Sequence, residues 1–154
     1  MGCSLEWARE ESEKKRKRDF REARKLFREQ DRSWWLDQAR TAFNQFIRLR
    51  DRNLPCISCG RHHTGQYHAG HYRAAGNYSG LRFDERNVHK QCKPCNADLS
   101  GNLVDYRTGL LERVGSEVVD WLERKDHPPR RWEIEELKTI RKWYKRKIKR
   151  AQRD

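Results

Sequence analysis

The chain has few of the residues from which a large hydrophobic core is built. Only 34% of its 154 residues are apolar or aromatic, whereas 38% carry a charge. With glycine counted in place of tyrosine the apolar share is about 37%, where an ordinary globular domain has roughly 45–50%. A chain of this composition supports one small domain with charged extensions, and two separate cores are not expected.

Long hydrophobic runs are missing as well. No stretch approaches the ~20 apolar residues that a membrane-spanning helix needs, which excludes an integral membrane protein. The N-terminal residues contain no apolar segment typical of a secretory signal. We therefore expect the chain to act inside the cell and away from membranes.

Acidic residues are the minority charge. The chain has 23 Asp and Glu against 36 Lys and Arg, a net charge of +13. The excess is uneven, because residues 130–154 hold 11 basic and 4 acidic side chains while residues 1–33 hold 11 and 8. A chain with this balance is expected to bind a polyanion, and nucleic acid is the first candidate.

The N-terminal segment is predicted to be a charged helical arm over residues 1–32. Residues 5–30 contain no glycine or proline and are rich in Glu, Lys and Arg, which favour helix. Its apolar residues form only a broken stripe. Whether the arm lies along DNA phosphates or is a plain solvated face stays open at this point.

The folded domain is predicted over residues 33–154, with Ser33 as the cap of its first helix. Apolar residues at helical spacing predict helices over about 34–50, 103–114, 116–122 and 134–148. Two short strands are predicted near 66–73 and 80–89. The fold class is therefore α+β and mostly helical.

Four of the five cysteines form two C-x-x-C pairs, Cys56 with Cys59 and Cys92 with Cys95. In an intracellular chain two such knuckles predict a tetrahedral four-cysteine zinc site. Thiol–disulfide chemistry would need a C-x-x-C beside a βαβ pattern, which this sequence lacks. The remaining Cys3 is interpreted as an ordinary thiol in the arm.

The 32 residues between the knuckles form a loop that zinc would close, and this loop holds most of the histidines. His71 lies in one predicted strand, Asn87 and His89 belong to the other, and Asn96 follows the last cysteine. Together they suit a general base and a divalent metal ion placed across a phosphodiester. The loop also contains His62, His63 and His68, which are predicted to be solvated, with His62 as an alternative zinc ligand.

Several short motifs around these residues occur together in one known family. The runs Ala69-Gly70-His71-Tyr72-Arg73 and Glu85-Arg86-Asn87-Val88-His89-Lys90-Gln91-Cys92 resemble those of the NinG (Rap) recombination proteins of lambdoid phages. They also resemble the zinc-clamped His-Asn-His (ββα-metal) nucleases. The resemblance implies a small ββα-metal core, clamped by the four cysteines and flanked by helices.

The same resemblance implies an enzyme, a divalent-metal-dependent endonuclease that cuts Holliday junctions and D-loops during phage recombination. His71 would be the general base, Asn87 would orient it, and Asn96 would bind Mg²⁺ or Mn²⁺. Many relatives place an aspartate directly before the histidine, whereas this chain has Gly70. A second metal ligand must then come from elsewhere, with His89 or Asp84 as candidates.

The expected partner is branched DNA in the host cytoplasm, bound through its phosphates and by shape rather than by base sequence. Candidates to grip the scissile strand are Arg73, Arg82, Arg86 and Lys90. A homodimer and contacts with phage or host recombination proteins are further expectations. Two alternatives stay open: a non-catalytic zinc-stabilised nucleic-acid-binding module, and a helical interaction adaptor.

Overall fold

Helices account for most of the chain, and a two-stranded sheet lies between them. The computed structural model describes residues 2–153, and the side chains of residues 6–153. The elements in chain order are α1 (Gly2–Gln30), α2 (Arg32–Arg50), β1 (Tyr67–His71), η1 (Ser79–Leu81), β2 (Val88–Cys92), η2 (Pro94–Asp98), α3 (Leu103–Val114), α4 (Ser116–Glu123) and α5 (Ile134–Ala151). The prediction of a mostly helical α+β protein is confirmed.

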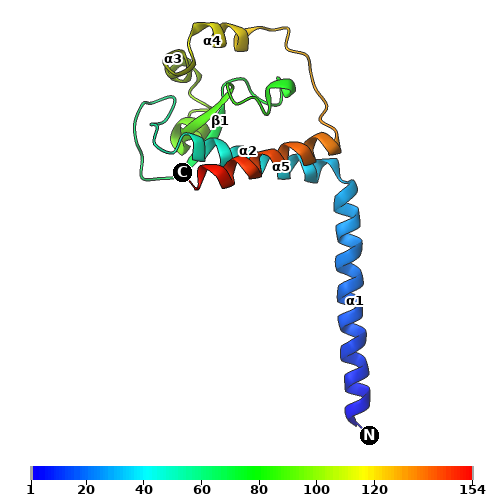
Figure 1. Ribbon diagram of the computed structural model, residues 1–154. Helices are drawn as coiled ribbons and strands as arrows, with labels where there is room; N and C mark the ends of the chain where they lie inside the picture. The colour runs from blue at the N-terminus through cyan, green and yellow to red at the C-terminus, as the bar shows by residue number, and fades with distance from the viewer. Residues whose placement is uncertain (1, 154) are drawn as a thin grey trace.

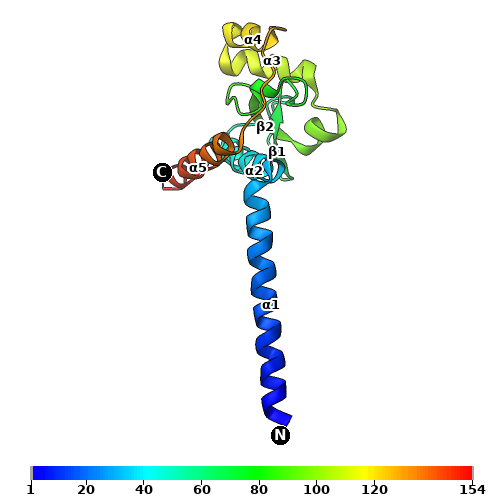
Figure 2. The same ribbon diagram turned by 90° about the vertical axis from the view of Figure 1, so that its right-hand side faces the viewer.

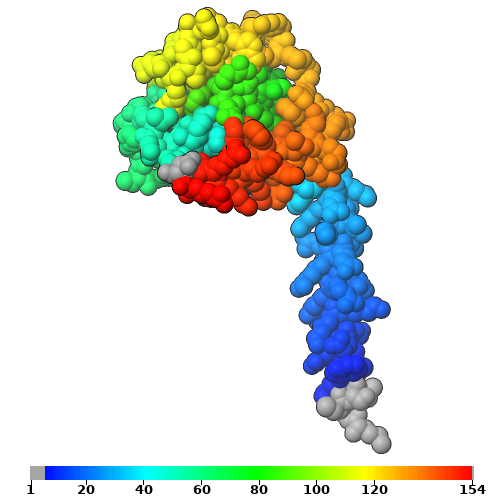
Figure 3. Space-filling model, viewed as in Figure 1, coloured from blue at the N-terminus to red at the C-terminus, as the bar shows by residue number. Residues whose placement is uncertain are grey.

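The helix α1 projects away from the folded body as a single rod (Figures 1 and 2). Its side chains are solvated, and Trp7, Phe20 and Phe27 are each more than 60% exposed. Charged neighbours one turn apart support it, as in the 2.7 Å pair between Lys17 and Glu13. The space-filling view shows how little of this helix the body covers (Figure 3).

The helix α2 begins earlier than the sequence analysis predicted, and its cap is Asp31 rather than Ser33. The Asp31 carboxylate accepts hydrogen bonds from the backbone N–H groups of Ser33 at 2.8 Å and Trp34 at 3.2 Å. Aspartate and serine cap helices about equally well, so the two candidates could not be ranked from residue type alone. The backbone at Asp31 is extended, which separates α1 from α2.

The strands β1 and β2 pair antiparallel, with Gly70 opposite His89 and His71 opposite Val88. The first strand lies where it was predicted. The second prediction, 80–89, was wrong over most of its length, because β2 occupies residues 88–92. Residues 79–86 instead form tight turns with local backbone hydrogen bonds, and the pairing with β1 begins where Val88 lies opposite His71.

The two faces of the sheet are covered by different helix pairs. On one face α2 and α5 lie side by side and run in the same direction, enclosing Phe43, Ile47 and Tyr144 with Val88 (Figure 1). On the other face α3 and α4 bury a second cluster around Tyr106 and Leu110. No helix in the part of the chain that the structure describes is long and apolar enough to cross a membrane.

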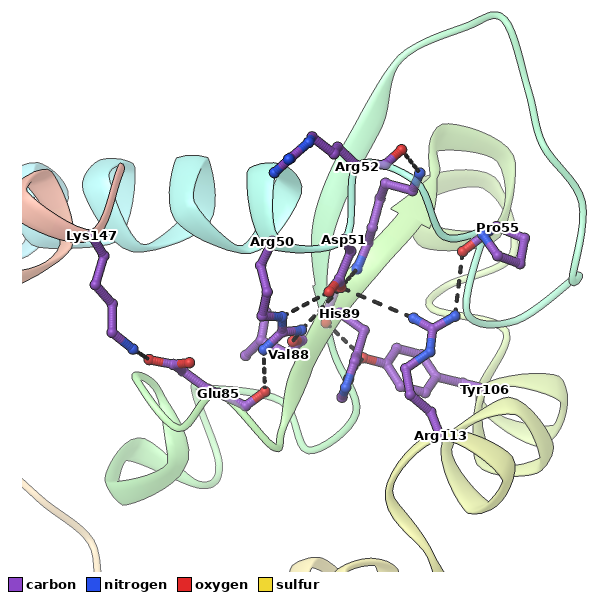
Figure 4. A network of polar contacts seen from close by, with 12 residues as sticks. Arg50, Asp51, Arg52, Pro55, Glu85, Val88, His89, Tyr106, Arg113 and Lys147 are labelled. Atoms are coloured by element: carbon purple, nitrogen blue, oxygen red, sulfur yellow. Dashed lines mark hydrogen bonds and ion pairs between the residues drawn. The ribbon is translucent and has the colours of Figure 1, made fainter. Parts of the chain in front are cut away.

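A buried polar network joins the end of α2 to β2 and α3 (Figure 4). The Asp51 carboxylate, only 2% exposed, accepts two hydrogen bonds from Arg50 at 2.7 and 2.9 Å. It also accepts the backbone N–H of Lys90 at 2.9 Å and lies 4.0 Å from Arg113 on α3. Arg50 in turn donates to the carbonyl oxygens of Glu85 and Val88, so this network fixes the sheet against α2.

Candidate functional site

The four cysteines of the two knuckles come together as predicted. The Sγ atoms of Cys56, Cys59, Cys92 and Cys95 all lie within 4.8 Å of one another. Four thiolates at about 2.3 Å from one ion need a spacing of this size, so the cluster could bind a metal ion. Gly60 has φ +64°, a left-handed conformation that glycine adopts without strain and that closes the turn of the first knuckle. The Gly60 N–H donates to the Cys56 carbonyl oxygen at 3.0 Å.

Hydrogen-bond donors surround the thiol sulfurs. The Cys92 N–H donates to Cys56 Sγ at 3.4 Å, and Asn102 Nδ2 donates to Cys95 Sγ at 3.6 Å. His63 Nε2 lies 3.2 Å from Cys59 Sγ. Burial would raise the pKa of Cys59, but hydrogen bonds from His63 and Arg61 outweigh it and lower that pKa to about 6.

The Cys92 thiol behaves differently. Burial is the main cause that raises its pKa to about 12. A metal ion bound here would have to displace that proton, because thiolate and not thiol is the ligand. Metal affinity should therefore fall in acid.

His71 lies at the end of β1 and is held in one orientation. Its Nε2 donates to the carbonyl oxygen of Arg82 at 3.0 Å, and a carbonyl can only accept. In the neutral imidazole the free lone pair is therefore on Nδ1. Burial lowers the pKa of His71 below its ordinary value, an effect that the nearby Arg82 charge reinforces and the hydrogen bond to the carbonyl only partly offsets. His71 is thus a neutral, oriented base near pH 7.

Asn87 fixes the loop that holds His71. It is fully buried, and its Oδ1 accepts the Arg73 N–H at 2.8 Å. Its Nδ2 donates to the carbonyl oxygens of Arg73 at 3.0 Å and Leu81 at 3.2 Å. This side chain therefore ties the residues after β1 to the turn that presents the Arg82 carbonyl to His71.

A cleft of about 390 Å³ opens beside His71. Its lining combines α2, β1, the following loop and the turn after the second knuckle: Arg40, Asn44, Ala69, His71, Ala74, Ala75, Arg82, Asn96, Ser100 and Gly101. His71 and Asn96, predicted from sequence as a pair, therefore line the same cleft. Arg40 and Arg82 add positive charge to it.

Asn96 lies in the helical turn η2, directly after the last cysteine. Its Nδ2 lies 2.9 Å from His68 Nδ1, which orients the amide. The prediction that His68 is a solvated loop residue was therefore wrong, because it is part of β1 and contacts Asn96. His63 lies in a loop as predicted but is half-buried and contacts Cys59, whereas His62 is exposed as predicted.

The other proposed metal ligands lie outside the cleft. His89 is 3% exposed, lies beside Tyr106, and lines a separate hollow with Arg50 and Arg113. Burial and the Arg50 charge lower its pKa to about 3. Asp84 accepts two hydrogen bonds from the Arg86 guanidinium, at 3.0 and 2.7 Å.

The four predicted DNA contacts are in different surroundings. Arg82 lines the cleft, and Arg86 lies exposed over the Trp121 ring at 3.9 Å. Arg73 lies over the Tyr78 ring at 4.0 Å. Lys90 needs correction, because it is 5% exposed and its Nζ donates to the Arg52 carbonyl oxygen at 3.1 Å, so it is not available to grip a strand.

Sequence reasoning missed Arg40 and Gln91. Arg40 is on an exposed face of α2 and comes from outside the motifs, so only the packing of α2 beside the sheet reveals its place. Gln91 was inside a quoted motif but was assigned no role, and it lies in the part of β2 beyond the strand that was predicted to end at residue 89.

The fold and site define a small α+β protein with a four-cysteine cluster that could bind a metal ion, and a cleft lined by His71. Comparison with known proteins identifies the family to which the chain belongs. The family model described as "Bacteriophage Lambda NinG protein" matches residues 4–154, and the chain belongs to this NinG family of lambdoid phages. No solved structure matches the chain.

Individual relatives agree with this assignment. Over 118 residues, 77% of this chain, it is 54% identical to protein ninG of Salmonella phage P22 and 53% identical to protein ninG of Escherichia phage lambda. Protein ninG of Escherichia phage 933W is 52% identical over the same length. The matched segment spans 58%, 57% and 58% of these three relatives.

Proposed function

We propose that the chain is a structure-specific DNA endonuclease for branched recombination intermediates, with His71 as its general base. The observation that carries this proposal is the orientation of His71. Its Nε2 is bound to the Arg82 carbonyl oxygen, so a neutral Nδ1 is left to take a proton from an attacking water. Asn87 supports the same loop, and Asn96 lines the same cleft.

The four-cysteine cluster is proposed to bind one structural zinc ion. An all-thiolate tetrahedral donor set is typical of structural zinc, and no open position is left for chemistry. The ion would join two segments 32 residues apart and stabilise a chain with little apolar core. β2 ends at Cys92, so the zinc site also holds the strand opposite His71 in place.

The residues around the cleft suit phosphodiester hydrolysis. A Mg²⁺ or Mn²⁺ ion bound at Asn96 would stabilise charge that develops on the phosphate and the leaving oxygen. His71 would hold the proton taken from water, and the Arg82 carbonyl would stabilise the resulting imidazolium. Burial of His71 favours its neutral form before the reaction.

Positive charge near the cleft suits a DNA phosphate. Burial lowers the pKa of Arg82, and the charges of Arg40 and Arg32 lower it further. A bound phosphate would relieve this repulsion, which makes the three arginines a candidate backbone-binding group. Further basic residues are exposed on α5: Lys142, Lys145, Arg146 and Lys149.

The test is cleavage of a labelled four-way junction by the zinc-loaded chain, with Mg²⁺ or with EDTA, beside a linear duplex of the same sequence. We expect cutting of the junction with Mg²⁺ only. His71→Ala should cut at least about 100-fold more slowly, the usual lower bound for loss of a general base. His62→Ala is the matched control, since His62 is exposed, and it should cut like the wild type. Binding of the junction without cutting would favour the non-catalytic module instead.

A further inference from the structure

One buried amide oxygen near the His71 cleft has no hydrogen-bond partner. Gln91 is fully buried, and its Nε2 donates to Ser58 Oγ at 2.7 Å and to the Gly101 carbonyl oxygen at 2.6 Å. Because a carbonyl oxygen only accepts, the amide nitrogen must face Gly101. Gln91 Oε1 therefore faces the other way, and it is unpaired.

That oxygen points at Gly70. A Cβ placed on Gly70 would lie 2.1 Å from Gln91 Oε1 and 3.1 Å from Asn96 Oδ1. A side chain at position 70 is therefore excluded by the Gln91 amide. The two oxygens flank a single point, so they are no farther apart than the sum of those two distances.

Asn96 contributes its oxygen for a similar reason. Its Nδ2 is turned to His68 Nδ1 at 2.9 Å, which leaves Oδ1 on the side of Gly70. His68 therefore orients the Asn96 amide, whereas Ser58 and Gly101 orient the Gln91 amide. Both oxygens are acceptors, and one of them is buried without a donor.

An unpaired buried acceptor is destabilising and calls for a bound ion or water. Hard divalent cations accept amide carbonyl oxygens as ligands. Among the side chains of residues 6–153, the four cysteines are the one group of three or more His, Cys, Asp or Glu side chains close enough to hold a metal ion. No Asp or Glu side chain is among the residues that line the cleft, so the amide oxygens are the candidate ligands for a cation there.

We propose that Gln91 Oε1 and Asn96 Oδ1 together bind a divalent cation, with Gln91 taking the place of a carboxylate at position 70. This inference rests on the proposed function for its biological meaning, although the site itself stands on the geometry of these two amides. A site without a carboxylate should bind the cation weakly, with water and DNA phosphate completing the coordination. Affinity should therefore rise when DNA is present.

The test measures Mn²⁺ binding by the paramagnetic resonance signal of free Mn²⁺, using the zinc-loaded full chain without DNA. We expect Asn96→Ala and Gln91→Leu to weaken binding at least tenfold and Asn96→Asp to tighten it. Asp84→Asn is the matched control, because its carboxylate lies outside the cleft, and it should leave binding unchanged. Binding that survives Asn96→Ala and Gln91→Leu in folded protein would overturn the proposal.

A second pair of variants keeps the test independent of any folding defect in Gln91→Leu. Gly70→Asp alone should lower the melting temperature, because its Cβ meets Gln91 Oε1. The double variant Gly70→Asp/Gln91→Ala should regain stability and bind Mn²⁺ at least as tightly as the wild type. Gly70→Asp that melts like the wild type, or a double variant that binds no Mn²⁺, would contradict the site.

The outcomes separate this site from the proposed function. Mn²⁺ binding that depends on Gln91 and Asn96, in a chain that cuts no branched DNA, would keep the site and overturn the endonuclease proposal. The opposite outcome is junction cleavage that is abolished by His71→Ala but keeps the wild-type rate in Gln91→Leu and Asn96→Ala. It would keep the endonuclease proposal and overturn the cation site.

Discussion

Replacing Asp51 by asparagine should cost the protein a large part of its stability. The change keeps the shape of the side chain but removes its charge. An asparagine oxygen in place of Oδ2 can still accept the Lys90 N–H, whereas the NH₂ group in place of Oδ1 would then face Arg50 Nε, donor against donor. Arg50 would be left without its carboxylate partner at the junction of α2 and β2.

The expected size of the effect follows from burial. Removing one partner of a buried ion pair costs roughly 3–5 kcal/mol. The Arg50 side chain keeps 25% of its surface exposed while Asp51 keeps 3%, so we expect the lower end, about 3 kcal/mol. For a chain of this length that lowers the melting temperature by roughly 6–12 °C.

The dependence on pH gives the prediction a second readout. Burial alone would raise the pKa of Asp51, but the Arg50 hydrogen bonds and charge and the Lys90 N–H outweigh it and hold that pKa below its ordinary value. A carboxylate with a lowered pKa stabilises the fold above its unfolded pKa, about 3.9, and loses this effect as the pH falls through the folded value. The difference between wild type and Asp51→Asn should be full at pH 7 and shrink below about pH 4.

Urea unfolding followed by circular dichroism measures this difference. Asp37→Asn is the matched control, since Asp37 is on α2, the helix that ends directly before Asp51, is 61% exposed and pairs with Arg40 at 3.1 Å. An exposed pair of this kind contributes less than about 1 kcal/mol. If Asp51→Asn and Asp37→Asn unfold at the same urea concentration, the reasoning about the buried network is refuted.

Three further predictions concern packing and the cysteine cluster. Gly109→Ala should lower the melting temperature, because the added Cβ would lie 1.9 Å from the Ile57 carbonyl oxygen in the first knuckle. Gly76→Ala is its control and should melt like the wild type, because nothing lies within 4 Å of a Cβ there. Tyr106→Phe should cost about 0.5–1.5 kcal/mol in urea unfolding by removing the buried hydrogen bond that Tyr106 donates to the Gly70 carbonyl oxygen, and an unchanged midpoint would contradict this. Elemental analysis should find one zinc per chain, lost together with helical circular dichroism in Cys56→Ser, and a metal-free chain that stays folded would refute the zinc proposal.

Local patterns sufficed for much of the fold. The helical spacing of Phe43, Phe46 and Ile47 and the C-x-x-C knuckles are short-range signals, and the helices and the cysteine cluster are present as predicted. The position of β2 could not be read in this way. Its ladder depends on Cys92 being held opposite Tyr67, whereas residues 80–87 have strand-like composition but form local turns.

The site was predictable to the extent that it is local. His71, Asn87 and Asn96 were named from short motifs; the structure places His71 and Asn96 in one cleft and bonds Asn87 to the residues that follow β1. The place of Arg40 depends on how α2 packs, and the role of Gln91 depends on the space beside Gly70. Neither contact is encoded by neighbours in sequence. The burial of Lys90 was missed because a charged residue type predicts exposure, whereas the long aliphatic stem of a lysine can be buried by packing.

The most direct test of the central claim is the single-turnover rate of four-way junction cleavage as a function of pH, for wild type and His71→Ala at saturating Mg²⁺. A general base must be neutral, so the rate should fall in acid as His71 gains a proton. Because burial lowers the pKa of His71, the wild-type rate should stay high down to pH values below about 6.5. His71→Ala should be slower at every pH and lack this acid limb. Equal rates for the two proteins across the pH range would contradict the assignment of His71 as the base.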